Sequence, residues 1–217
     1  MNNNKLFSLE GRSAIVTGES GLLAPIWKET LQSAGATVYT FGLPNCDVTN
    51  MSQVLHFAKE RPDIDILVNN AGIDNPPTSK ATFFGNCQQI LEVNLQGAVN
   101  MCEAFIPVMV SRGGGVIANI GSIMGYGAAD FRNYSDPDFA KPIGYNLSKW
   151  GYRGLSKSIC VQFGRYGIRA VTPSFGPYNG GKLSQEFLDK FLHNVPLHRT
   201  VSKESLQMTL LYAVCCP

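Results

Sequence analysis

The sequence predicts a single α/β domain over residues 1–217, and three observations lead to this class. Short apolar runs of strand length alternate along the chain with stretches of helical pattern. Hydrophobic residues make up 44% of the chain and charged residues only 16%, which is typical of a compact protein with many buried strands. A chain of 217 residues is also long enough to enclose one large core.

Charge, hydropathy and cysteine usage limit the partners, metal sites and cellular location that we expect for this chain. The net charge of +2 gives no indication of a nucleic-acid or membrane-surface partner. No apolar run approaches the about 18 residues that a membrane span needs, and residues 1–10 contain no signal-peptide core. The six cysteines show no metal-ligand spacing, so we expect no metal site and a reducing, cytoplasmic location.

The first predicted strand, Ser13–Val16, runs into a glycine-bearing turn. This turn, Thr17 to Pro25, is followed by a helical pattern that extends to about Ala34. The free backbone N–H groups and the dipole at the start of a helix favour an anion, so the turn is a candidate phosphate site. An ordinary strand-to-helix turn is the alternative, because Ala24 stands where a third glycine is expected.

The second predicted strand, Ala36–Phe41, lacks a feature that dinucleotide-binding folds use. In those folds a carboxylate at the end of this strand binds the adenosine ribose, and here that place is Gly42, with no arginine nearby. We therefore expect a weak preference between NAD and NADP, which Gly42→Asp would move towards NAD. The chain then passes directly to Asp47, which leaves no room for a further helix and strand. Asp47 is either a helix cap, in competition with Thr49 or Asn50, or an adenine contact.

Side-chain amides follow the next strand, Ile64–Val68. Asn69-Asn70-Ala71-Gly72 ends it, and the end of a strand is where an open parallel sheet places its ligand. A helix is then predicted over Gln88–Ser111, and it contains Asn94. Since asparagine is a poor residue for a helix interior, Asn94 indicates either a local kink or a functional role.

The strongest chemical signal is the pair Tyr145 and Lys149. Residues four apart share one helix face, so the two side chains can converge. A nearby ammonium favours the phenolate and lowers the phenol pKa from about 10, which suits general acid/base chemistry. Ser122 follows the apolar run 116–120 and can hold a substrate oxygen beside Tyr145. The alternative is a surface helix that carries both residues by chance.

The segment Met124–Pro142 separates Ser122 from Tyr145 and mixes aromatic with charged residues. Its position favours a substrate-contacting loop over a loop that only covers the surface, and Arg132 is the expected anion contact. Downstream, the sequence predicts a strand at 168–172 and helices at 183–192 and 202–215.

Five separated signals occur in one order: Thr17-Gly18 with Gly21, Asp47, Asn69-Asn70-Ala71-Gly72, Asn94, and Ser122 with Tyr145 and Lys149. This ordered set resembles the short-chain dehydrogenase/reductase (SDR) family over nearly the whole chain. The segment Asp130-Phe131-Arg132-Asn133-Tyr134 more loosely resembles the flagellin-modification branch, whose members act on sugar nucleotides or sugar phosphates.

The resemblance implies a doubly wound, Rossmann-like parallel sheet in a three-layer sandwich that binds NAD or NADP. It implies an oxidoreductase of a secondary alcohol and a carbonyl, which forms a homodimer or homotetramer. Tyr145 is then the general acid/base, Lys149 its partner and a ribose contact, Ser122 the substrate-orienting hydroxyl, and Asn94 the holder of a water. The cofactor residues implied are Gly18, Ser20, Gly21, Leu22 and Leu23 at the pyrophosphate, Asp47 and Val48 at the adenine, Asn70, Ala71 and Gly72 at the ribose, and Pro173 near the nicotinamide.

The chain also departs from the family pattern. Leu22 and Ala24 replace glycines, Ser174 replaces the glycine after Pro173, and the helix and strand before Asp47 are missing. The strand at 168–172 is short, and the sequence ends at Pro217 without a final sheet strand. A catalytically silent or incomplete homologue, acting as a nucleotide-binding or subunit protein, is therefore the alternative function.

Overall fold

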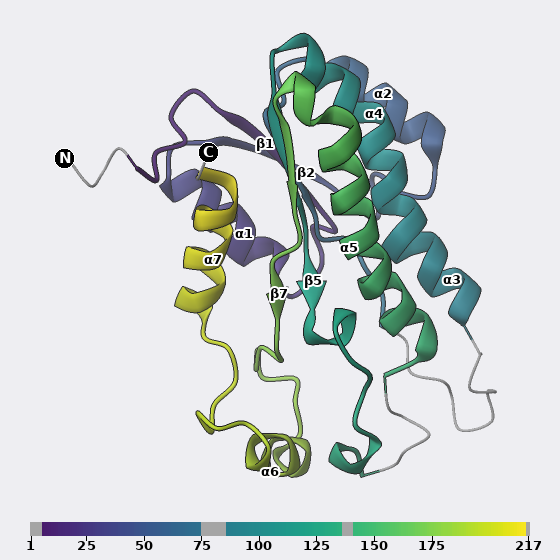
Figure 1. Cartoon of the computed structure of the whole chain (residues 1–217), viewed down its shortest axis with the longest axis vertical. Helices are drawn as coiled ribbons and strands as arrows, with labels where there is room; N and C mark the ends of the chain where they lie inside the picture. The colour runs from purple at the N-terminus through teal and green to yellow at the C-terminus, as the bar shows by residue number, and fades with distance from the viewer. Residues whose placement is uncertain (1–5, 75–85, 136–140, 216–217) are drawn as a thin grey trace.

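The computed structural model describes residues 6–74, 86–135 and 141–215 of the chain. Five parallel strands form one sheet in the order β2-β1-β3-β4-β6, with helices on both faces (Figure 1). The strands are β1 Ser13–Thr17, β2 Thr37–Phe41, β3 Ile66–Asn69, β4 Gly115–Asn119 and β6 Ile168–Val171. The predicted doubly wound α/β fold is confirmed. The chain adds β2 on one side of β1 and then β3, β4 and β6 on the other, so the strand order reverses between β1 and β3.

The central strands are apolar on both sides because both faces of the sheet are covered. On one face, Ile15, Leu67 and Ile117 pack against α2 (Met51–Glu60), α4 (Gly97–Ser111) and α5 (Ile143–Phe163). On the other face, Ala14 and Val68 pack against α1 (Ala24–Ser33) and α7 (Lys203–Cys215). Successive residues of a strand point to opposite faces, so a strand between two helical layers must be apolar throughout.

The connection after β2 is as short as the sequence predicts. β2 ends at Phe41, and α2 begins at Met51 with Asn50 as its N-cap, whose side chain accepts a hydrogen bond from the Gln53 backbone N–H at 3.2 Å. No strand of the described residues lies outside β2, so β2 and β6 are the two edge strands of this sheet.

The predicted helix over 88–111 is continuous but not regular. It consists of α3 (Cys87–Leu91), a π-helical turn η2 (Glu92–Gln96) and α4. Asn94 lies in the π turn and is fully buried, so the helix departs from regular α geometry at the residue for which the sequence indicated a kink or a functional role. A π turn within an α-helix is often found at functional sites.

This helical stretch also meets a length and composition test for a membrane span. Cys87–Ser111 is long and apolar enough to cross a bilayer, yet 56% of its most apolar window is buried inside the fold. Its apolar residues pack against α2, α5 and the sheet, which is the pattern of a core helix.

Beyond the sheet, two short parallel strands continue β4 and β6. β5 (Gly121–Ser122) pairs with β7 (Ser174–Phe175); the predicted strand 168–172 is β6, and β7 follows it as a further short strand. Gly121 is needed here, because a Cβ at that position would lie 2.4 Å from the Ser174 hydroxyl oxygen. Two 3-10 turns, η3 (Ile123–Gly125) and η4 (Phe131–Asn133), and the helix α6 (Gln185–His193) lie at the same end of the molecule (Figure 1).

Candidate active site

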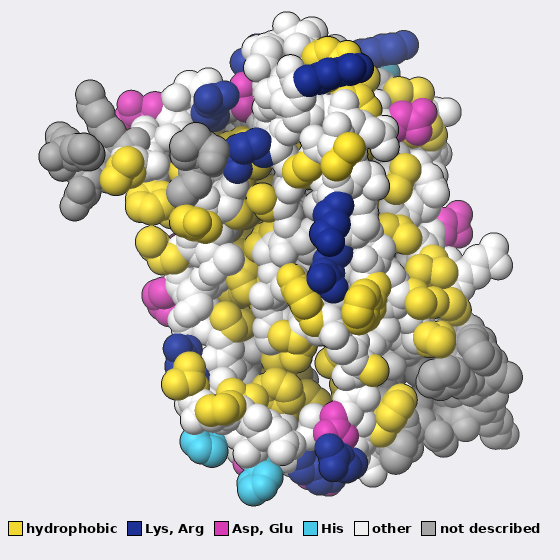
Figure 2. Space-filling model, viewed as in Figure 1, with side chains coloured by type: hydrophobic (Ala, Val, Ile, Leu, Met, Phe, Trp, Pro, Cys, Tyr) yellow, Lys and Arg dark blue, Asp and Glu magenta, His cyan; other side chains and the backbone are white. Residues whose placement is uncertain are grey.

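A cavity of about 370 Å³ opens at the carboxyl ends of the strands. It is lined by the turn after β1, the segment after β3, the β5 and β7 strands, α5 and α6. In the space-filling view, apolar side chains gather in the lower half of the picture, between α7 and α5 (Figure 2). The cavity therefore lies where an open parallel sheet places its ligand.

Ser122 and Tyr145 meet in this cavity from different elements. Ser122 ends β5, and its hydroxyl accepts a hydrogen bond from the Met124 backbone N–H at 3.1 Å. Tyr145 stands in the first turn of α5 and is hydrogen-bonded through its side chain to Ser122. The two predicted hydroxyls are thus brought together, although 23 residues separate them in the sequence.

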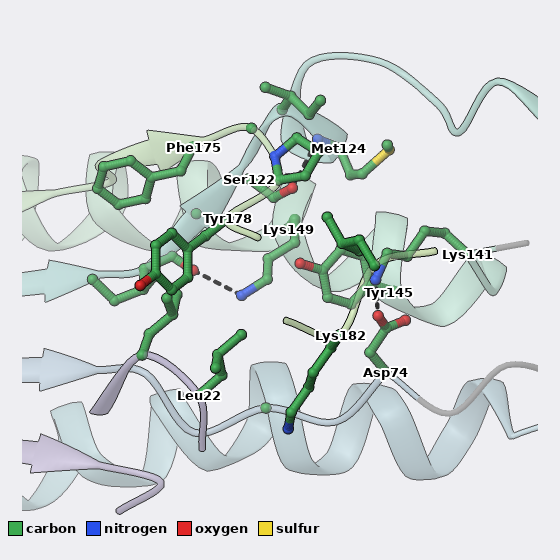
Figure 3. Close-up of a pocket in the computed structure, with 18 of the residues that line it drawn as sticks. Leu22, Asp74, Ser122, Met124, Lys141, Tyr145, Lys149, Phe175, Tyr178 and Lys182 are labelled. Carbon is green, nitrogen blue, oxygen red and sulfur yellow. Dashed lines mark hydrogen bonds and ion pairs between the residues drawn. The ribbon is translucent and has the colours of Figure 1, made fainter. Parts of the chain in front are cut away.

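Lys149 lies one turn further along α5, beside Tyr145 (Figure 3). Its ammonium is 5.5 Å from the centre of the Tyr145 ring, and it donates a hydrogen bond of 2.7 Å to the Ile120 carbonyl oxygen. Burial, with a smaller contribution from the charge of Lys141, lowers the pKa of Lys149 to about 7. The side chain is therefore placed as the four-residue spacing predicts.

The pKa of Tyr145 differs from the expectation. The spacing predicted a lowered value, but burial raises the pKa of the Tyr145 phenol, and the Ser122 hydrogen bond opposes this only in part. The reason is that the cavity wall removes water from the phenolate and from the Lys149 ammonium alike. In this state the tyrosine keeps its proton at neutral pH and is suited to donate it.

Asn94 connects the π turn η2 to the segment after β3. Its side chain accepts a hydrogen bond from the Ile73 N–H at 2.7 Å and donates one to the Ile73 carbonyl at 2.9 Å. It also lies 3.4 Å from the Ser148 hydroxyl. The buried amide therefore fixes the backbone beside Gly72, which also lines the cavity.

The turn after β1 brings bare backbone to the cavity. Gly18 has φ +74°, and a Cβ there would lie 2.7 Å from the Ala71 Cα, so only glycine fits without displacement. Gly21, Leu22 and Leu23 line the cavity, whereas Ser20 is exposed. Leu23 is the N-cap of α1 and offers no capping side chain; the Ala24 N–H donates to the Gly21 carbonyl at 3.3 Å, and Pro25 has no N–H.

Ala24, which stands where a third glycine is expected, fits into the core. It is 2% exposed and packs among the core residues under α1.

Thr17 holds the turn after β1 and the end of β3 in register. Its hydroxyl accepts hydrogen bonds from the backbone N–H groups of Asn70 and Ala71, at 3.0 and 2.9 Å. The Asn70 amide in turn donates to the Thr17 carbonyl at 2.9 Å and accepts from the Trp27 indole N–H at 2.8 Å. Asn70 and Gly72 line the cavity, so this network places the predicted ribose segment.

Six of the predicted cofactor residues do not line this cavity: Gly18, Ser20, Asp47, Val48, Ala71 and Pro173. The Asp47 carboxylate accepts hydrogen bonds of 2.9 Å from the backbone and the hydroxyl of Thr49, while Asn50 caps α2. Val48 is buried in the core, and Pro173 is buried with its carbonyl bonded to the Gly121 N–H at 2.8 Å. Beside Pro173, the residues Phe175 to Tyr178 reach the cavity instead.

Several functional candidates were missed by the sequence reasoning. Lys141 and Asp74 form an ion pair in the cavity, and the Lys141 ammonium is 4.8 Å from the centre of the Tyr145 ring (Figure 3). Burial lowers the pKa of Lys141 to about 8. Lys182 also lines the cavity. Lys141 precedes Pro142, the N-cap of α5, so the helical spacing that joins Tyr145 to Lys149 does not extend to it and gave no signal.

The segment 124–142 contacts the cavity only in part. Met124, Asn133 and Lys141 line it, and the Tyr134 ring packs on Phe187 of α6 at 5.3 Å. Residues 136–140 lie outside the described residues.

Arg132, the anion contact expected from the sequence, does not line the cavity. Its side chain is 88% exposed and pairs with Asp130 at 2.7 Å. The sequence pattern placed Arg132 in the right segment, but the short 3-10 turn η4 leaves it on the surface.

Comparison with known proteins settles the family. The profile of the short chain dehydrogenases matches residues 5–186. The chain belongs to the short-chain dehydrogenase family. It is 31% identical to a 7alpha-hydroxysteroid dehydrogenase of Clostridium sardiniense over 94% of this chain and 86% of that one. The predicted family of NAD(P)-dependent oxidoreductases is thereby confirmed.

Solved structures agree with the fold of this SDR protein. A short chain dehydrogenase of Leptospira borgpetersenii with bound NAD+ superposes with a TM-score of 0.83 at 23% identity, over 99% of this chain and 89% of that one. A gluconate 5-dehydrogenase of Burkholderia cenocepacia in complex with NADP and tartrate gives 0.79 at 23% identity, over 98% and 91%. At this identity the likeness concerns the fold, and the substrate of each protein is its own.

Proposed function

We propose that this protein is an NAD(P)-dependent oxidoreductase that interconverts a secondary alcohol and a carbonyl group on a sugar phosphate or sugar nucleotide. The observation that carries the proposal is the meeting of Ser122, Tyr145 and Lys149 in one cavity with the bare turn after β1. Such a turn, ending in an uncapped helix, fits a pyrophosphate. The residues fit a dinucleotide, since Gly21, Leu22, Asn70 and Gly72 line the same cavity as Tyr145 and Lys149.

The roles follow from the positions of the side chains. The nicotinamide ring supplies or accepts the hydride. Ser122 donates a hydrogen bond to the substrate oxygen and orients it, and Tyr145 gives that oxygen its proton during reduction and takes it back during oxidation. Lys149 binds the nicotinamide ribose and stabilises the phenolate left after proton transfer. Asn94 holds the segment after β3 and a water of the proton relay.

We assign the remaining predicted residues to the cofactor as well. The backbone from Gly18 to Leu23 faces the pyrophosphate, and Asn70 to Gly72 face the ribose region. Asp47 and Val48 lie near the adenine, and Pro173 supports the segment beside the nicotinamide.

The substrate class rests on the lysines of the cavity. Lys141 and Lys182 come from different segments and line the same wall as Phe187 and Phe191. An ammonium binds phosphate as a point charge, and aromatic faces pack on sugar rings or bases, so this wall suits a phosphorylated sugar or a sugar nucleotide. The carboxylate of Asp74 holds Lys141 in place and is exchanged for the substrate anion when it binds.

We propose a cytoplasmic location, with which the free thiols of Cys46, Cys87, Cys102 and Cys160 are consistent. We propose a homodimer or homotetramer as the working assembly, which sedimentation equilibrium measures directly.

A titration of NADH and NADPH, followed by nucleotide fluorescence, tests the function first. Binding of either nucleotide, with turnover on a panel of keto-sugar phosphates, is the expected result. Binding without turnover on any carbonyl substrate would favour the silent homologue, and no binding would refute the proposal.

The substrate class has its own test. Lys141→Met is expected to raise KM for a phosphorylated sugar at least about tenfold, which is the effect of losing one charge-assisted contact. KM for the unphosphorylated sugar should stay within about twofold of the native value, because that sugar has no phosphate for Lys141 to bind. Arg132→Ala is the matched control, because it removes an equal charge outside the cavity. Equal KM changes in the two variants would exclude Lys141 as the anion contact.

A further inference from the structure

The end of β2 carries no side chain, and the structure shows why. Gly42 follows β2 and is buried. A Cβ at Gly42 would lie 2.8 Å from the backbone nitrogen of Glu19, which belongs to the turn after β1. The place where dinucleotide-binding folds put a carboxylate is thus closed by the neighbouring turn, and Gly42→Asp would have to displace Glu19.

Glu19 brings its own carboxylate to this place. One carboxylate oxygen, Oε2, accepts a hydrogen bond of 2.6 Å from the Thr40 hydroxyl, and Thr40 is the last but one residue of β2. Among the described residues, the other oxygen of Glu19 has no hydrogen-bond partner. A half-buried carboxylate with a free oxygen therefore stands at the carboxyl end of β2, although it comes from a different element.

The charges around Glu19 are not balanced by a basic group. Within the described chain, no lysine or arginine forms an ion pair with Glu19. Burial, and then the negative charges of Glu19 and Glu60, raise the pKa of the Cys46 thiol. The carboxylates of Glu19 and Glu60 therefore both make the surroundings of Cys46 more negative. Arg61 is nearby, but its guanidinium stacks on the Tyr39 ring at 4.6 Å and lies 3.9 Å from Glu60.

We propose that Glu19 binds the adenosine ribose hydroxyls of the dinucleotide and makes the protein select NAD(H) over NADP(H). The proposal rests on the proposed function. A carboxylate accepts hydrogen bonds from ribose hydroxyls, and it repels the phosphate that NADP carries at the 2′ position. The turn that holds Glu19 also faces the pyrophosphate, since Gly21 to Leu23 line the cavity. The residue thus supplies the group that Gly42 lacks.

The test is a pair of titrations, with NADH and with NADPH, on the wild-type protein and on Glu19→Gln. The native protein is expected to bind NADH at least about tenfold more tightly than NADPH, the size of one charge-assisted contact. Glu19→Gln keeps the shape and the bond to Thr40, and it should weaken NADH binding and tighten NADPH binding until the two affinities agree within about threefold.

Glu60→Gln is the matched control, because it removes the same charge near the same edge of the sheet from a half-exposed side chain. Its NADH to NADPH affinity ratio should stay within twofold of the native ratio. Thr40→Val provides a second variant, which keeps the carboxylate and removes only its partner, and it should retain the preference for NADH.

Two results would overturn the inference. A native protein that binds NADPH as tightly as NADH, or a ratio that Glu19→Gln leaves unchanged, excludes Glu19 as the selecting group while the proposed function stands. Failure of the native protein to bind either nucleotide would overturn both together.

Discussion

Replacing Tyr145 by phenylalanine separates chemistry from folding in this site. The variant keeps the ring, and with it the approach of the Lys141 and Lys149 ammonium groups, which lie 4.8 and 5.5 Å from the ring centre. It loses only the hydroxyl and its hydrogen bond to Ser122. One such bond contributes about 1 kcal/mol, so the free energy of unfolding should fall by no more than about 1.5 kcal/mol.

The effect on turnover should be much larger. A positioned general acid contributes about 10²- to 10⁴-fold in rate, so kcat should fall by at least that factor. The affinity for the cofactor should change by less than about 1 kcal/mol, because one hydrogen bond at most is lost. Stopped-flow hydride transfer measures the chemical step, and nucleotide fluorescence measures the affinity of the same preparation.

Tyr152→Phe is the matched control for this prediction. Tyr152 is fully buried and lies about two turns after Tyr145 on α5. The centre of its ring is 4.5 Å from the Lys149 ammonium. Its hydroxyl has no hydrogen-bond partner among the described residues. Its loss should leave kcat within about threefold, since no proton is removed from the cavity. Near-full turnover of Tyr145→Phe on a confirmed substrate would refute the assignment of the general acid.

Three further predictions concern the framework of the site. Gly18→Ala should destabilise the protein by about 1–3 kcal/mol, measured by urea unfolding, because φ is +74° and the new Cβ meets Ala71; an unchanged midpoint would contradict the close approach. Thr17→Val should lower the free energy of unfolding by about 1–3 kcal/mol and weaken NADH binding, since it leaves the N–H groups of Asn70 and Ala71 without their acceptor. An NADH affinity equal to that of the native protein, measured by calorimetry, would argue against this role. Burial lowers the folded-state pKa of Lys149 from 10.5 to about 7. The buried ammonium therefore reduces the free energy of unfolding by its full amount below pH 7, and this reduction disappears as the pH rises towards 10.5. The melting temperature should therefore rise between about pH 6.5 and 8.5 more in the native protein than in Lys149→Met, and parallel curves would exclude a lowered pKa.

The sequence by itself determined the fold and the common helix face of Tyr145 and Lys149. The alternation of apolar strands with helices follows from local periodicity, and the spacing of Tyr145 and Lys149 fixes their common face on any helix. The short passage from Gly42 to Asp47 excluded a further strand, because too few residues separate them to form one. Asn94 likewise indicated a local kink or a functional role, since asparagine disfavours a regular helix interior, and the structure has a π turn there.

Only the tertiary structure decided which distant groups share the site. Lys141 meets Asp74 across 67 residues of chain, and Glu19 meets Thr40 across a strand and a helix. These approaches depend on how parallel strands align their carboxyl ends, which local sequence patterns do not encode. Burial decided the direction of the Tyr145 pKa in the same way, because desolvation depends on every element that closes the cavity rather than on the spacing within one helix.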